Sequence, residues 1–403
     1  MSTGRHDALE HVYREEAGRL VAALVRLLGD FDLAEDMVAE ALLEALDHWP
    51  RDGVPDRPGA WLLQTARRKA LDRLRREQRG REKLALVASL GPAPRRDTDD
   101  RLRLLFTCCH PALPEEGRIA LTLRAVAGLT TREIARAFVV PEATIAQRIV
   151  RAKRKIAGAR IAYRLPEGED LHERLRAVLT VLYLVFNEGY LATAGEATRA
   201  ELAQDAEWLV GLVAGLLPDE PEPLGLLALF RLHRARWAAR FDGDGRLLLL
   251  QEQDRRRWDR AAIADAGRVI RRAAALGRTG PYQVQAAIAA VHAEASSWEQ
   301  TDWPQIVALY SLLASLDRSA VVRLNRAIAR SHVVGPAAAL ADVETLAAEL
   351  DRYYLFYATR AALLRELGRG REALLADERA LALTANPAER RLLRERRRTG
   401  SGP

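Results

Sequence analysis

Residues 129–156 read LTTREIARAFVVPEATIAQRIVRAKRKI, and this stretch decides the kind of fold that the chain adopts. Thr130 or Thr131 can cap a short helix, because a hydroxyl oxygen accepts a hydrogen bond from the free N–H groups of a first helical turn. A tight turn is predicted at 139–141, and a second helix begins near Glu142. The core-facing side of the first helix is predicted to hold Ile134, Ala135 and Phe138. This pattern is a helix-turn-helix, a motif that places its second helix in the major groove of DNA.

The second helix of this motif has one apolar and one polar face. Apolar residues recur at three- and four-residue spacing, at Ile145, Ile149, Ala152 and Ile156. The opposite face carries side chains that suit base edges in the major groove, namely Thr144, Gln147, Arg148 and Arg151. Three further cations are suited to phosphates, namely Lys153, Arg154 and Lys155. The alternative is an amphipathic hairpin with a solvated basic face. The charge balance disfavours it, because residues 118–160 hold ten Lys and Arg against two acids.

Charge is distributed unevenly along the chain. The sequence has 403 residues and a net charge of +7, and its isoelectric point near 9.7 permits a polyanionic partner. Residues 1–50 hold eleven acids against four arginines, whereas residues 67–83 hold nine Lys and Arg against three acids. An acidic module followed by two basic ones indicates a protein partner for the first and nucleic acid for the other two.

The composition predicts an all-helical protein of several domains. Apolar residues make up 49% and charged residues 29% of the chain, and runs of β-branched residues are scarce. A chain of 403 residues exceeds what one core normally serves, so two to four domains are expected. The longest strongly apolar run, 177–186, is too short to span a membrane, and the polar amino terminus lacks the order of a secretory signal. Because the two cysteines, Cys108 and Cys109, are adjacent, a reducing compartment and therefore the cytoplasm are expected.

The first hundred residues are predicted to form a helical module and a linker. Periodic apolar residues predict helices at 7–28, 33–48 and 59–78. Asp32 is the predicted cap of the second of these helices. The segment 48–58 has three prolines and a glycine, so an ordered loop is expected there. Residues 80–100 are predicted to be a flexible linker to a second helical module at 101–160.

The remainder is predicted to be a helical extension at 170–290, followed by helical repeats at 291–400. In the span 354–387 two helices flank Gly368, and the unit ends at Pro387. Small residues stand where closely packed helices need them, at Ala361, Ala373 and Ala380. The span resembles a tetratricopeptide unit, and 320–350 is a looser relative. Because two units are fewer than a free-standing solenoid needs, they are expected to stack on the preceding helices.

With two basic modules behind an acidic one, residues 5–160 resemble sigma factors of the sigma-70 family, extracytoplasmic-function (ECF) group. Residues 5–79 resemble region 2 of that family, and residues 101–160 resemble its region 4. The resemblance implies that region 2 binds the clamp of core RNA polymerase and the minus-10 element of promoter DNA. It also implies that region 4 binds the minus-35 element and the polymerase flap.

Within region 2, this resemblance assigns roles to individual residues. The segment DLAEDMVAEALLEA at 32–45 resembles the helix that docks on the clamp, held in its module by Leu33, Met37 and Leu42. The polymerase-binding residues are then Asp32, Glu35, Asp36 and Glu40. The segment GAWLLQTARRKALDRLRR at 59–76 resembles the part that meets the minus-10 element. Its DNA-binding residues are then Trp61, Arg67, Arg68, Lys69, Arg73, Arg75 and Arg76.

Two details of this module concern melted DNA. The family usually has Ala-Arg-Asn before the basic run, whereas this chain has Ala66, Arg67 and Arg68, which adds a charge. By resemblance, the loop 48–58 and Trp61 would hold a base extruded from the duplex. For Trp61 alone a core position is the preferred interpretation, because it lies in an apolar stripe with Leu62.

Motifs farther along extend the resemblance to nearly the whole chain. They are FTCCHP at 106–111, YLVFNEGY at 183–190, LQEQDRRRWD at 250–259, GPYQVQAAIAAVHAE at 280–294 and NPAERR at 386–391. These motifs are similar to those of the ECF subgroup with a long, tetratricopeptide-like carboxy-terminal extension. In that subgroup the extension takes the regulatory place of an anti-sigma factor, which implies a regulatory protein partner at the extension. Neither a cofactor nor a membrane partner is implied.

Other signals have plainer interpretations. Cys108, Cys109 and His110 lack the second Cys/His cluster that a zinc site needs, so buried small side chains are preferred and no metal is expected. The segment 242–245 has two acids of a calcium loop but lacks the others, so it is predicted to be a turn. The segment 251–259 can be a polar interaction site or a salt-bridged helix start.

The function predicted from all of this is a sigma factor with a regulatory extension, and not an enzyme. The sequence contains no phosphate-binding glycine loop, nucleophile elbow or His-rich metal helix. The alternative is a helix-turn-helix regulator with a repeat-type sensor domain that never joins polymerase. That alternative leaves the acidic helix and residues 67–83 without a joint purpose. A third hypothesis places an enzyme or metal sensor in residues 170–403.

Overall fold

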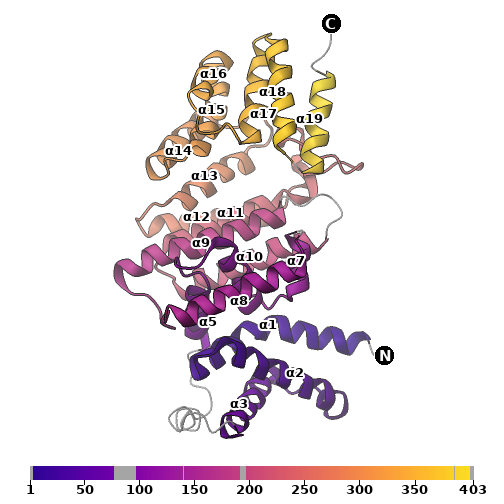
Figure 1. The fold of residues 1–403 in the computed structure, drawn as a ribbon. Helices are drawn as coiled ribbons and strands as arrows, with labels where there is room; N and C mark the ends of the chain where they lie inside the picture. The colour runs from indigo at the N-terminus through magenta and orange to yellow at the C-terminus, as the bar shows by residue number, and fades with distance from the viewer. Residues whose placement is uncertain (1–2, 77–96, 139, 191–196, 385, 400–403) are drawn as a thin grey trace. The chain divides into compact units, whose positions relative to one another are not determined.

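The computed structural model describes residues 3–76, 97–138, 140–190, 197–384 and 386–399, and these residues are helical almost throughout (Figure 1). They form two compact units, the first from α1 to α10 and the second from α11 to α19. Within the described ranges there is no strand, only an isolated bridge between Phe241 and Leu247. The predicted all-helical class is therefore confirmed.

The first three helices of the chain pack as one module. They are α1 (Thr3–Leu28), α2 (Phe31–Asp52) and α3 (Pro58–Arg76). Helix α3 contributes a four-residue apolar stripe to the core, made of Leu62, Ala66, Ala70 and Leu74. The cap of α2 is Asp30 and not the predicted Asp32, because the Asp30 carboxylate accepts hydrogen bonds from the N–H groups of Asp32 and Leu33. Met37 is buried as predicted, whereas Leu33 and Leu42 are half-buried.

The loop predicted at 48–58 is mostly helix, since α2 continues through Pro50 to Asp52. Proline costs a helix one hydrogen bond, but Pro50 lies in the last turn and is exposed, so little packing is disturbed. Trp49 anchors that turn, because it is buried and meets the Trp61 ring edge-on at 5.7 Å. The helix ends at Gly53, whose φ of 86° suits glycine and whose N–H donates to the Trp49 carbonyl.

The second module begins earlier than the sequence predicts. Its helices are α5 (Asp97–Cys108), α6 (Glu115–Ala125), α7 (Thr131–Ala137) and α8 (Glu142–Gly158). Of the linker predicted at 80–100, residues 80–96 lie outside the described residues, and the last four form the first turn of α5. Asp100 holds this turn in the helix, because its buried carboxylate accepts hydrogen bonds from Arg26 at 2.9 Å and from Arg103 at 3.0 Å.

Two helices of the predicted extension belong to the first unit. They are α9 (Gly168–Tyr190) and α10 (Ala197–Leu216). The buried Arg174 of α9 donates to the carbonyl of Phe106 at 2.8 Å, within the FTCCHP motif. The guanidinium of Arg101 lies 5.5 Å from the ring centre of Trp208 in α10. These contacts tie α9 and α10 to the helix-turn-helix module.

The second unit is a succession of helices and short 3-10 turns. In chain order they are α11 (Pro221–Ala235), η1 (Trp237–Ala239), η2 (Leu250–Glu252), η3 (Arg255–Arg257), α12 (Arg260–Ala275), α13 (Pro281–Glu294), α14 (Trp303–Leu316), α15 (Ala320–Val334), α16 (Pro336–Glu344), α17 (Tyr354–Glu366), α18 (Gly370–Leu383) and α19 (Pro387–Thr399). Helices α17 and α18 form the predicted hairpin, and the three small residues between them are buried, namely Ala361, Ala373 and Ala380.

The two weaker motifs of the second unit are structural. The carboxylate of Asp242 accepts from the N–H groups of Asp244 and Arg246, which makes 242–245 the predicted turn. In the segment 251–259, the buried Arg255 donates to the carbonyls of His292 and Ala295, at 2.6 Å each. This segment is therefore a packing junction. Among the described helices, none combines the length and the apolar character needed to cross a membrane.

Candidate nucleic-acid interface

The helix-turn-helix is built as its sequence predicts. Thr130 and Glu133 form a reciprocal cap at the start of α7, since the Glu133 carboxylate accepts from the Thr130 N–H at 2.7 Å and the Thr130 hydroxyl accepts from the Glu133 N–H at 3.2 Å. Ile134 and Ala135 are buried, and Phe138 is half-buried. The buried residues of α8 are the four predicted ones, Ile145, Ile149, Ala152 and Ile156. Packing of this stripe fixes which face of α8 is presented to a partner.

The polar face of α8 carries the predicted base-reading residues. Gln147 and Arg151 are exposed, while Thr144 and Arg148 are half-buried. Farther along the helix, Arg154 and Lys155 are exposed. A helix presented in this way has donors and acceptors on a convex surface, which is the geometry that the major groove admits.

Lys153 departs from this arrangement. Its side chain is only 10% exposed, and its ammonium donates to Asp32 at 2.7 Å and to Glu35 at 3.0 Å. Burial by itself lowers the pKa of Lys153, but the two carboxylates outweigh it, so the pKa lies above its ordinary value. A cation predicted for DNA phosphate is therefore paired with two acids predicted for polymerase.

In the first module, the predicted basic and acidic residues also pair with one another. Lys69 of α3 lies 3.0 Å from Glu44 and 3.7 Å from Glu40 of α2. Arg68 also pairs with Glu44, whose pKa is lowered chiefly by the hydrogen bond from Lys69. Lys69 and Glu44 are half-buried, whereas Arg68 is 62% exposed, so the pair of Arg68 with Glu44 is worth little on its own.

The remaining predicted residues of this module, where the structure describes their side chains, are half-buried or exposed. Arg73 is 3.5 Å from Asp36, and Arg75 is 3.8 Å from Asp72. Arg67 is half-buried, and the side chain of Arg76 lies outside the described residues. Trp61 is half-buried between the rings of Trp49 and His48, so it forms part of the packing and still reaches the surface.

Several residues that sequence reasoning missed join the two modules. The hydroxyl of Tyr163 lies 2.9 Å from the Ala22 carbonyl and 3.0 Å from the Asp100 carbonyl. Gly18 of α1 lies so close to Val126 that an added Cβ would be 2.3 Å from the Val126 carbonyl oxygen. No periodicity marks such residues, since only the folded chain brings them together.

The adjacent cysteines are buried, as predicted. Cys109 lies 3.3 Å from the Thr122 hydroxyl, and burial raises the pKa of its thiol to about 12. Burial likewise raises the pKa of Cys108. Among the described residues no cluster of three or more His, Cys, Asp or Glu is arranged for a metal ion.

Comparisons with known proteins agree with this architecture. Residues 12–80 match the family model of sigma-70 region 2, and residues 103–156 match that of sigma-70 region 4. Residues 174–274 match a family of unknown function, DUF6596. No solved structure matches.

Relatives are found among curated proteins. An uncharacterized protein of Rhizobium meliloti is 47% identical over 386 residues, covering 93% of this chain and 91% of that protein. The ECF RNA polymerase sigma factor SigL of Mycobacterium tuberculosis is 32% identical over 151 residues, which cover 36% of this chain and 84% of SigL. The probable ECF RNA polymerase sigma factor SigI of the same species is 32% identical over 168 residues, which cover 39% of this chain and 57% of SigI.

A helix-turn-helix that matches region 4, behind a basic helical module that matches region 2, defines a sigma-70 type initiation factor. Within that class, the chain belongs to the ECF sigma factor family. Like other sigma factors, it directs transcription initiation, and sigma factors as a family are regulatory proteins.

Proposed function

We propose that this sigma factor joins core RNA polymerase through α2 and recognises a promoter at two separate elements. The acidic face of α2, with Asp32, Glu35, Asp36 and Glu40, docks on the polymerase clamp. The basic face of α3 follows the melted minus-10 strand, and α8 reads the minus-35 duplex while its module rests on the polymerase flap. Because core polymerase and promoter DNA share the cytoplasm, the factor works there.

One observation carries this proposal. The buried stripe of α8 turns Gln147, Arg148 and Arg151 toward solvent in a module that adjoins a second basic module. Arg can donate two hydrogen bonds to guanine, and Gln can bond adenine at two points, so this face suits sequence reading. The exposed cations of α3 suit backbone contacts to a single strand.

The extension regulates this activity in the proposal. Supporting it, α9 and α10 pack on the helix-turn-helix module through Arg174 with Phe106 and through Arg101 with Trp208. A change in α9 or α10 therefore reaches the promoter-reading module directly. The working division of the chain is region 2 at 5–79, region 4 at 101–160, a helical extension at 170–290 and repeats at 291–400, with a regulatory protein bound at the extension.

Transcription in vitro tests the proposal. Core polymerase is combined with the full chain and with a chain that ends after Leu216, where the first unit ends. A promoter-specific transcript from at least one form is expected, with a difference in yield between them that measures regulation by the second unit. Absence of promoter-specific initiation from both forms would refute the proposed function, and equal yields would refute only the regulatory role of that unit.

A further inference from the structure

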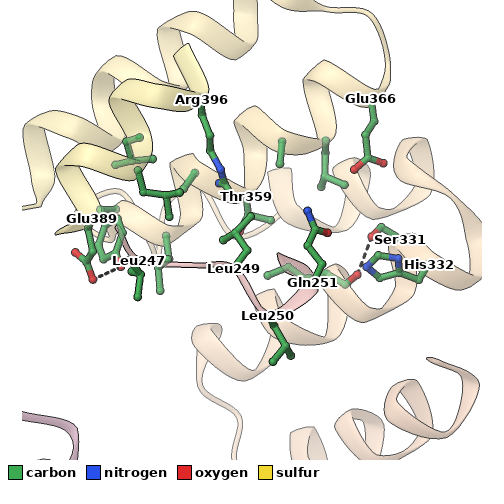
Figure 2. Close-up of a pocket in the computed structure, with 18 of the residues that line it drawn as sticks. Leu247, Leu249, Leu250, Gln251, Ser331, His332, Thr359, Glu366, Glu389 and Arg396 are labelled. Atoms are coloured by element: carbon green, nitrogen blue, oxygen red, sulfur yellow. Dashed lines mark hydrogen bonds between the residues drawn. The ribbon is translucent and has the colours of Figure 1, made fainter. Parts of the chain in front are cut away.

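The second unit contains a hollow of about 480 Å³ (Figure 2). Helices α15, α17 and α19 and the segment 247–251 surround it. Its volume falls within the range of small-molecule sites. The residues proposed to meet polymerase and DNA all lie outside this hollow, so the proposed function gives it no role.

One wall of the hollow is an apolar run that the fold leaves partly uncovered. Residues 247–250 are four consecutive leucines, and each of them is only half-buried. Three of the four, Leu247, Leu249 and Leu250, line the hollow. Apolar surface gathered around a hollow is what a ligand with an apolar body can cover.

Hydrogen bonds fix the backbone of this leucine wall. The Leu248 N–H donates to the Arg240 carbonyl at 2.8 Å, and the Leu248 carbonyl accepts from the side-chain amide of Gln253 at 3.3 Å. The Glu252 carboxylate accepts from the Leu249 N–H at 2.7 Å. Because the wall is already ordered, a ligand that binds against it loses little of its binding energy to ordering the chain.

A second wall is one face of α17. Ala358, Ala362 and Glu366 line the hollow and follow one another at four-residue spacing, so they lie along one line on the helix. The two alanines leave room for a ligand beside the helix, and Glu366 is the last residue of α17. An apolar strip therefore leads to a carboxylate.

The other two charged side chains of the wall are already engaged within the protein. Glu389 accepts hydrogen bonds from the hydroxyls of Tyr354 and Thr384, at 2.5 Å each. Arg396 also has a partner within the chain. His332 is uncharged at neutral pH, because burial lowers its pKa further below neutrality. These groups therefore leave Glu366 as the charge that a ligand can meet.

Glu366 is exposed, and its carboxylate forms no hydrogen bond or ion pair with another residue in the described parts of the chain. Helix α17 has 13 residues, so Glu366 lies about 18 Å along the helix axis from Tyr354. Tyr354 is the residue that bonds Glu389, and Figure 2 likewise shows Glu366 on the opposite side of the hollow from Glu389. The available charge of the hollow is therefore negative and lies at one end.

We infer that the hollow binds a small primary amine with an apolar body. The ammonium group lies at Glu366, and the body lies along Ala358 and Ala362 against the leucines of 247–250. The sign of the available charge selects an amine over a carboxylate. The rings of Trp298 and Tyr354 in the wall suit an aromatic body. This goes beyond the proposed function, since binding requires neither polymerase nor DNA.

Calorimetry on the full chain tests this inference with three compounds that share one body. Phenylbutylamine is the probe, and phenylbutanol and phenylbutyrate are the matched neutral and anionic compounds. Phenylbutylamine should bind saturably at one site, about fivefold more tightly than phenylbutanol, as expected for an ion pair with an exposed carboxylate. Phenylbutyrate should bind more weakly than both. Salt should lower the affinity for the amine and leave that for the alcohol unchanged.

The variant Glu366→Gln should lower the affinity for phenylbutylamine to that for phenylbutanol, and should leave the affinity for phenylbutanol unchanged. Its matched control is Glu349→Gln, because Glu349 is an exposed carboxylate of the same unit outside the wall and should not matter. Ala362→Phe should weaken both compounds by about tenfold or more, because the added ring fills the hollow.

Three results would overturn the inference. They are absence of saturable phenylbutylamine binding, equal affinity of the wild type for the amine and the alcohol, and unchanged amine affinity in Glu366→Gln. Unchanged binding in a folded Ala362→Phe variant would place the amine outside the hollow and would also overturn it. Should Ala362→Phe fail to fold in thermal unfolding, the comparison of Glu366→Gln with Glu349→Gln still decides, since both substitutions are at exposed positions.

Discussion

Replacing Lys153 by methionine is expected to lower the free energy of unfolding of the first unit by about 2 kcal/mol. Methionine keeps most of the apolar stem and removes the ammonium group. The side chains of Lys153 and Glu35 are 10% and 20% exposed. Exposed ion pairs are worth about 0.2–1 kcal/mol, and buried pairs cost about 3–5 kcal/mol to break. The strength of this ion pair is expected to be intermediate. Asp32 is 79% exposed, so its pair adds at most about 0.5 kcal/mol.

A double-mutant cycle isolates this interaction. Lys153→Met and Glu35→Gln are made singly and together, and urea unfolding of each chain gives the free energy of unfolding of the first unit. A coupling of about 1 kcal/mol or more is expected between the two positions. Lys155→Met is the matched control, because Lys155 is exposed on the same helix and should show no coupling to Glu35.

The pH dependence provides a second readout. The pKa of Lys153 is raised in the folded chain, so its contribution is complete below the ordinary lysine pKa of about 10.4 and is lost as the pH rises through the folded value. The wild type should therefore lose stability in the first unit above that pH, and Lys153→Met should lack this loss. A coupling below about 0.3 kcal/mol, together with identical pH profiles, would refute the assigned ion pair.

Three further predictions test the site and the second unit. Arg148→Ala should weaken DNA binding by about 1–3 kcal/mol at one position of the minus-35 element, whereas Lys155→Ala should weaken binding to all sequences alike and reduce the slope of log affinity against log salt by about 1. Binding measured over a set of altered duplexes distinguishes the two variants. Equal, sequence-independent losses for both would contradict base reading by Arg148. Gly225→Ala should destabilise the second unit by about 1–3 kcal/mol in thermal unfolding, because the added Cβ would lie 2.6 Å from the backbone nitrogen of Gln283. Gly267→Ala is the control and should be neutral or stabilising, because its added Cβ would meet only the guanidinium of Arg271, at 3.5 Å. Burial lowers the pKa of His292 to about 4, so the stability of the second unit should fall as the pH drops from about 6.5 to 4. His292→Gln should flatten this part of the plot of stability against pH. Parallel plots for the wild type and the variant would refute a neutral, buried His292.

Periodic packing was the part of the fold that the sequence could predict. The stripe Ile145, Ile149, Ala152 and Ile156 follows from helix geometry alone, because side chains three and four apart share a face. The predicted alanines between α17 and α18 follow from the same geometry, since close helices exclude larger side chains. Both predictions depend on neighbours within one hairpin.

Predictions failed where a distant residue decided the outcome. Proline and glycine content predicted a loop at 48–58, but packing of Trp49 against Trp61 keeps the last turn of α2 helical. The polar composition of 80–100 predicted a linker to its end, but Arg26 in α1 recruits Asp100 into a folded helix. Lys153 was predicted to contact DNA phosphate, and its pairs with Asp32 and Glu35, more than a hundred residues away, were not predicted.

In the proposed function the same charges serve two purposes, and their burial is expected to determine the order in which salt acts on them. Lysines and arginines that suit phosphates suit carboxylates equally, so a chain with an acidic and a basic surface pairs them when no partner is present. At 0.1 M salt the interaction between exposed charges decays over a length of about 10 Å, whereas buried pairs are screened much less. The exposed pair of Arg73 with Asp36 should therefore loosen before the more buried pair of Lys153 with Glu35. Measuring how each of these two pairs responds to rising salt tests whether burial sets the order, and loss of the Lys153 pair before the Arg73 pair would contradict it.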